Sequence, residues 1–252
     1  MTQQELLFQY TLRLADDALI MGHRLGEWSS KAPILEEDLA LTNMALDYIG
    51  RAEALLQYAA EIEGKGQSEN DLAYKRDERQ FYNHLLCEQP NGNFADTMVR
   101  QLLLSTFEYH LYTALLSSKD AQLSAIAHKA IKEIKYHKQH AHDWCVRLGD
   151  GTAESNAFMR AALDQLWMYT GELFEKDEVI EWLSTAGIAV DVSTLEGVWT
   201  SEIINTLQEA QLSMPQKGYM QTGSSKGIHS EHLGYLLAEM QYLPRAYPTA
   251  KW

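Results

Sequence analysis

The residues best suited to chemistry in this sequence are nine histidines and thirty-five acidic side chains. On long helices such residues can form a carboxylate-bridged di-iron centre, in which each iron binds one imidazole. The usual motif is Glu-x-x-His on two helices, because residues three apart share a helix face and reach one metal. None of the histidines has Glu or Asp three residues before it. The sequence therefore lacks the standard ligand motif.

A smaller constellation remains on one predicted helix. Glu133, His137 and His140 are spaced so that they share one helix face. We favour a partly buried His137 that is hydrogen-bonded to Glu133. The alternative is a stand-alone ferritin-like metal-dependent oxidase that uses Glu108, Glu133 and His137. Further acids lie in or near the predicted helix seams: Asp38, Asp47 and Glu53.

Two other groups of residues have simpler interpretations. His229 and His232 follow a Gly-rich segment (216–227) that is predicted to be mobile, so we expect them to be solvated or to cap a helix. Lysines at every third position of 129–138 drift around their helix, which favours a solvated face. The alternative for these lysines is contact with an acidic partner or with the anionic tail of a substrate.

Composition excludes several classes of function. The net charge of −14 disfavours binding to nucleic acid and to anionic lipid. No apolar run reaches the roughly 18 residues of a membrane-spanning helix. Acidic residues interrupt the apolar positions near the N-terminus, whereas the apolar region of a signal peptide is continuous. Cys87 and Cys145 are widely separated, which indicates free thiols. We therefore expect a cytoplasmic protein.

Long helices must position these residues. The stretches 34–89 and 91–214 contain no proline, and apolar residues recur in steps of three and four, as in Leu35, Leu39 and Leu46. Asn93 with Asp96, and Ser193 with Glu196, have capping-box spacing. The predicted helices are 5–29, 34–63, 70–88, 94–118, 120–148, 154–175, 178–186, 191–213 and 229–243. Short connections indicate an all-α, up-down bundle.

Whole segments of the chain resemble the C subunits of the ring-1,2-phenylacetyl-CoA epoxidases, which are bacterial multicomponent oxygenases. The matching segments are TLRLADDALIMGHRLGEW (11–28), EEDLALTNMALDYIGRA (36–52), RDERQFYNHLLCEQPNGNFADTMVRQ (76–101), KAIKEIKYH (129–137) and HSEHLGYLLAEMQYL (229–243). The resemblance implies a single ferritin-like domain over 1–252, with a core bundle over about 5–175 and additional C-terminal helices over about 178–252.

The resemblance also implies a division of labour. A related catalytic A subunit would carry the di-iron centre and insert oxygen into phenylacetyl-CoA, with electrons from NADPH. In that subunit a segment similar to LDYIGRA has a carboxylate and, three residues later, a histidine, where this chain has Tyr48 and Arg51. The resemblance thus implies a structural subunit with degenerate ligand positions and no catalytic, cofactor-binding or metal-binding residue, with Glu133 and His137 as residual candidates.

Overall fold

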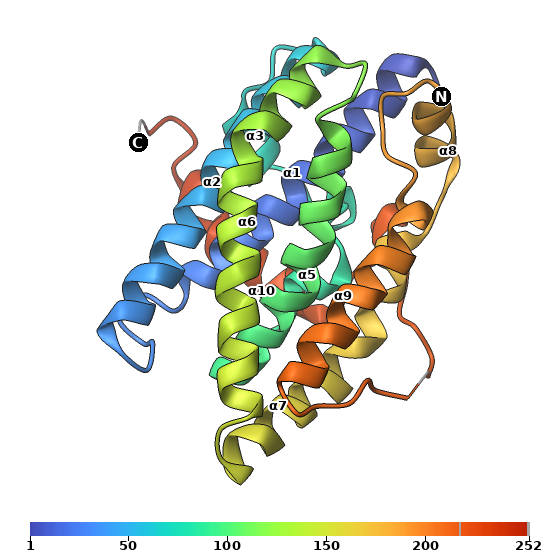
Figure 1. The fold of residues 1–252 in the computed structure, drawn as a ribbon. Coiled ribbons are helices and arrows are strands. Elements are labelled where there is room, and N and C mark those ends of the chain that lie inside the picture. Colours follow the sequence, from blue (N-terminus) through green and yellow to red (C-terminus); the bar gives the residue numbers. More distant parts are fainter. Residues whose placement is uncertain (217, 251–252) are drawn as a thin grey trace. The chain divides into compact units, whose positions relative to one another are not determined.

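The computed structural model describes residues 1–216 and 218–250. Every regular element in these two ranges is a helix, which confirms the predicted all-α bundle class (Figure 1). The chain divides into two compact units, Met1–Pro90 with the segment from Gly223 onward, and Asn91–Thr222. The single domain over 1–252, with a core bundle up to about residue 175 and additional C-terminal helices after it, stays a prediction. No helix of the described residues is long and apolar enough to cross a membrane.

The first unit is built on a pair of long helices, α1 (Gln3–Gly26) and α2 (Leu35–Glu63), which pack along each other (Figure 1). A capping box between Thr2 and Glu5 begins α1. The two helices approach closely at Gly22, where an added Cβ would lie 2.7 Å from the Ile49 side chain. The C-terminal part of the unit contains η5 (Ser224–Lys226), α10 (Glu231–Met240) and α11 (Tyr242–Ala246).

The prediction of one continuous helix over 70–88 is wrong. This stretch instead contains three short pieces, α3 (Glu69–Tyr74), η1 (Glu78–Gln80) and α4 (Leu85–Glu88). Between them the chain is extended, because its N–H groups have other acceptors. Tyr82 N–H donates to Asp16 at 2.9 Å, and His84 N–H donates to Asp17 at 2.7 Å. Two carboxylates of α1 therefore replace the carbonyl oxygens that a continuous helix would have used.

The apolar spacing that predicted α2 did not identify its core face. Leu41, Met44 and Leu55 are buried. Leu35 and Leu46, which belong to the spacing that indicated the helix, are exposed. Thus α2 has apolar residues on two faces, and only one of them belongs to the core.

The second unit is built on α5 (Phe94–Leu115) and α6 (Ala121–Gly149), which pack against each other (Figure 1). The predicted capping box of Asn93 and Asp96 is confirmed. The remaining elements are α7 (Ala153–Leu166), η2 (Trp167–Tyr169), η3 (Gly171–Phe174), α8 (Glu178–Thr185), η4 (Val192–Leu195) and α9 (Glu196–Glu209). The predicted cap at Ser193 is wrong, because Asp191 accepts the Ser193 N–H and the turn there is η4.

Candidate functional site

Tyr48 and Arg51, the proposed degenerate ligand positions, lie together on the buried face of α2. Their exposed fractions are 0% and 5%, and the Arg51 Cζ lies 4.6 Å from the centre of the Tyr48 ring. This is cation–π geometry, available because the two residues are three apart on a helix. A guanidinium has only N–H donors and keeps its positive charge, so it has no lone pair for a metal. This pair does not fit an iron site.

The residual candidates lie in the second unit. Glu108 of α5 and His137 of α6 are buried, whereas Glu133 and His140 are partly exposed. The Tyr136 ring lies beside the imidazoles of His137 and His140, at centroid distances of 6.3 and 6.0 Å. Among residues 1–216 and 218–250, no three His, Cys, Asp or Glu side chains are grouped so that they could hold a metal ion. The candidates of the stand-alone oxidase are therefore not part of such a group in the described residues.

The other candidate acids are on α2. Asp38 and Asp47 are partly exposed, and Glu53 is exposed. These positions differ from the buried face that carries Tyr48 and Arg51. The structure does not bring the three acids together as a metal-ligand group.

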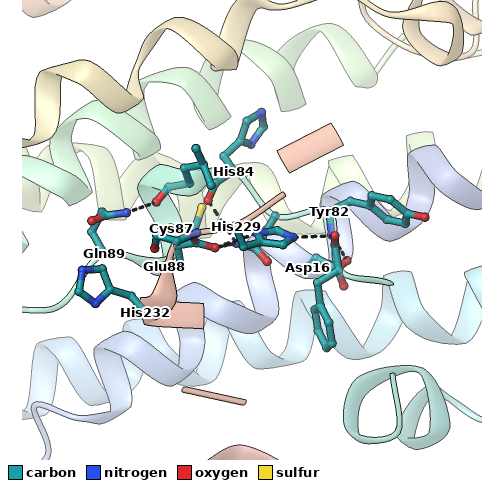
Figure 2. Close-up of polar contacts among 12 residues, drawn as sticks. Asp16, Tyr82, His84, Cys87, Glu88, Gln89, His229 and His232 are labelled. Atoms are coloured by element: carbon teal, nitrogen blue, oxygen red, sulfur yellow. Dashed lines mark hydrogen bonds and ion pairs between the residues drawn. The ribbon is translucent and has the colours of Figure 1, made fainter. Parts of the chain in front are cut away.

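A buried polar site of the first unit surrounds Glu88, and it was not predicted from the sequence (Figure 2). His229 donates from Nδ1 to Glu88 Oε2 at 2.9 Å and from Nε2 to the Phe81 carbonyl oxygen at 2.8 Å. The Ser230 N–H donates to Glu88 Oε1 at 2.6 Å, and the Asn83 amide donates to Oε2 at 3.1 Å. The side chains of Glu88 and His229 are fully buried. The expected solvated or capping role of His229 is therefore wrong.

The contacts of His229 define its charge. Both of its ring nitrogens face acceptors, a carboxylate and a carbonyl, so both carry a proton in the imidazolium form. Burial by itself lowers the pKa of His229, but the hydrogen bond and the negative charge of Glu88 outweigh it, and the pKa is raised. The pair is thus a buried, hydrogen-bonded ion pair.

A second buried pair involves Asp16 of α1. Arg76 donates both terminal nitrogens to the Asp16 carboxylate, and the Tyr82 N–H donates to Oδ2. Burial raises the pKa of Asp16, while the guanidinium and the Tyr82 N–H act against that rise. The Arg76 Cζ also lies 4.1 Å from the centre of the Phe81 ring. The bidentate contact between Arg76 and Asp16 holds the segment after α3 against α1.

The neighbouring Asp17 bonds a different set of groups. Its Oδ2 lies 2.7 Å from His84 Nδ1, and its Oδ1 accepts the Cys87 thiol at 3.4 Å. Cys87 is therefore a buried thiol that donates to a carboxylate. In the second unit, burial raises the pKa of the Cys145 thiol. Neither cysteine has the environment of a reactive nucleophile.

The sequence contained a signal for these sites. Asp16 and Asp17 interrupt an otherwise apolar helix stretch, and Glu88 follows the apolar LLC. An acid inside an apolar run has to be buried with a partner or turned outward. The partners could not be identified from the sequence, because His229 lies 141 residues after Glu88 and Arg76 lies 60 residues after Asp16.

The lysines of α6 have two different environments. Lys129, Lys132 and Lys135 are exposed, as the solvated-face interpretation predicts. Lys138 differs, because it forms an ion pair with Glu202 of α9, and its Nζ lies 4.2 Å from the centre of the Tyr109 ring.

Glu202 also connects α9 to α5. It lies 2.7 Å from His110 Nε2. Burial raises the pKa of Glu202, but the hydrogen bonds from Lys138 and His110 outweigh this, and the pKa is lowered. The ionised carboxylate therefore holds two helices of the second unit to α9.

Comparisons with known proteins confirm the resemblance seen in the sequence. A family model described as "Phenylacetic acid catabolic protein" matches residues 1–252. The C subunit of the 1,2-phenylacetyl-CoA epoxidase of Escherichia coli (strain K12) is 51% identical over 246 residues, which cover 98% of this chain and 99% of that relative.

Proposed function

The chain belongs to the phenylacetic acid catabolic protein family, and from this premise we propose that it is a non-catalytic structural subunit of a phenylacetyl-CoA 1,2-epoxidase complex. In this proposal it supports and docks the A subunit, which carries the di-iron centre, in the cytoplasm. The relative is named as a subunit of the epoxidase, which supports membership in a complex.

The observation that carries the proposal is the cation–π contact between Tyr48 and Arg51 on the buried face of α2. A buried guanidinium at a position proposed to correspond to a histidine ligand opposes the approach of a cation. It also lets the chain fold without a cluster of buried carboxylates, which would be costly without a metal. This chain's helices would then act as a rigid support, since a metal site must be held to a fraction of an ångström.

The proposal is tested by co-expressing the chain with the di-iron A subunit. We expect one complex by light scattering, iron in proportion to the A subunit, and epoxidase activity only when both proteins are present. The chain purified alone should contain far less than one iron per molecule by elemental analysis.

The competing function, a stand-alone oxidase, makes the opposite forecast. If the chain alone bound iron stoichiometrically, and His137→Ala removed both the iron and an oxidase activity, the structural role would be wrong. Glu133→Gln serves as the partner variant, because the alternative uses both residues as ligands. Tyr136→Phe is the matched control, since it lies on the same helix and has no ligand role in either proposal.

A further inference from the structure

An exposed row of leucines runs along the N-terminal half of α2. The exposed fractions of Leu35, Leu39 and Leu46 are 71%, 57% and 63%. At about 100° per residue these side chains fall within about 40° of the helix circumference, and they extend over about 16 Å. We call Leu35, Leu39 and Leu46 the outer stripe of α2.

The outer stripe lies on the opposite side of α2 from its core face. By the same helical geometry, it is about 160–180° from Met44 and Leu55, which are buried. A helix on a protein surface normally has polar residues opposite its core. Farther along, that side has Gly50, which has no neighbour near the site of a Cβ, and then the exposed Glu53. The apolar surface is therefore a bounded patch.

Charges on α2 restrict what can cover this patch. The helix carries seven acidic residues and one basic residue, Arg51, which is buried. Glu36 and Asp47 flank the outer stripe on one side, and Asp38 flanks it on the other. A second copy of this chain would set acidic flanks against acidic flanks, which is unfavourable. An anionic membrane is disfavoured for the same reason.

We propose that the outer stripe of α2 docks an amphipathic helix of the A subunit, a helix with an apolar stripe flanked by lysine or arginine. This inference rests on the proposed function and adds the docking surface and the chemistry of the partner. Apolar side chains form the centre of such contacts, while charges at the rim select the partner and its orientation. Placement on α2 gives the partner contact with the same helix that holds Tyr48 and Arg51.

The experiment compares the affinity of the purified A subunit for three forms of the full chain, measured by calorimetry. The first is the native chain. The second is the double variant Leu39→Gln/Leu46→Gln, which removes the apolar contact without adding charge. The third is Phe158→Gln/Val198→Gln, a matched control, because both of these residues are also exposed apolar side chains but lie on α7 and α9. Urea unfolding should give the same midpoint for all three, since the substituted side chains are exposed.

We expect the stripe variant to raise the Kd by about 10- to 100-fold, and the control variant to change it less than about threefold. A Glu36→Lys/Asp38→Lys variant should also weaken binding, because it opposes a basic partner helix. If the native and stripe variants bind the A subunit equally well, the inference is wrong while the proposed function stands. If the native chain does not bind the A subunit, the proposed function fails and the inference fails with it. Loss of self-association in the stripe variant with unchanged binding to the A subunit would identify a second copy as the occupant and overturn the inference.

Discussion

At the scale of single residues, two buried acids of the first unit each face a basic side chain. Glu88 faces His229, and Asp16 faces Arg76. Removing one member of such a pair leaves an uncompensated buried charge, which costs more than the intact pair contributes. These side chains therefore determine which segments of the chain must meet.

The Glu88–His229 pair makes stability depend on pH. Because the folded-state pKa of His229 is raised above 6.5, its stabilisation is fully present below pH 6.5 and is lost as the pH rises through the folded-state value. His229→Leu should lower the free energy of unfolding by about 3–5 kcal/mol at pH 6. The difference between the native protein and this variant should shrink toward pH 9, as measured by urea unfolding.

The control for this pH dependence is His128→Leu, because His128 is exposed on α6. That variant should run parallel to the native protein at every pH. A His229→Leu difference that stayed constant between pH 6 and pH 9 would contradict a charged His229. Glu88→Gln should abolish the loss of stability above pH 6.5, since burial lowers the pKa of the imidazole and the Glu88 carboxylate is the main group that raises it.

Tyr48 and Arg51 support a second prediction at the residue scale. The double variant Tyr48→Glu/Arg51→His restores one Glu-x-x-His motif on α2, but the described residues provide no second group of ligands. We expect elemental analysis to find no stoichiometric iron, and assays with phenylacetyl-CoA to find no epoxidation. Binding of two irons with turnover would show that a second ligand set exists.

The contacts of individual residues could be predicted only where they involve neighbours in the sequence. The capping box of Asn93 and Asp96 follows from sequence spacing, and the structure confirms it. His229 could not be placed, because its partners are Glu88 and the Phe81 carbonyl, far away in the sequence. A histidine after a glycine-rich segment gives no local indication that it will be buried.

At the scale of helices, the apolar periodicity predicted the long helices but did not show which face of each helix is buried. The spacing of α2 predicts a helix, yet apolar residues on two sides of it leave the core face ambiguous. In 70–88 the local pattern was helical, but the hydrogen bonds that Tyr82 and His84 donate to Asp16 and Asp17 keep the chain extended between η1 and α4. Long-range acceptors therefore overrode local helix propensity.

Packing between helices gives a prediction for Gly149, the last residue of α6. A Cβ there would lie 2.3 Å from the Ala210 carbonyl oxygen and 2.8 Å from the Ala210 Cβ, just after α9. Backbone atoms cannot move away as easily as a flexible side chain can. Gly149→Ala should therefore lower the free energy of unfolding by about 1–3 kcal/mol, as measured by urea unfolding. Gly197→Ala is the control, because nothing lies near its Cβ position on α9. It should be neutral or stabilise by up to about 1 kcal/mol, and equal effects of the two substitutions would argue against close packing at Gly149.

At the scale of the whole molecule, the first unit is completed by both ends of the chain. Residues up to Pro90 and the segment from Gly223 form one compact unit, although 132 residues, Asn91–Thr222, separate them in sequence. The C-terminal segment supplies His229 and Ser230 to Glu88, and Gln241 donates to the Arg76 carbonyl oxygen at 2.9 Å. The N-terminal helices therefore contact a segment that lies far away in the sequence.

Truncation after Thr222 tests whether the N-terminal helices depend on that segment. The shortened chain keeps Glu88 but loses the imidazolium and the N–H group that bind its carboxylate, so a buried charge is left uncompensated. We expect trypsin to cleave rapidly within 1–90, at bonds that resist in the full chain. Removal of 248–252 alone is the matched control, because the described part of that end is exposed, and it should leave the cleavage pattern unchanged. Equal protease resistance of 1–90 in the chain truncated after Thr222 and in the full chain would mean that Glu88 does not need its C-terminal partners. The buried pair would then be a consequence of the fold and not a condition for it.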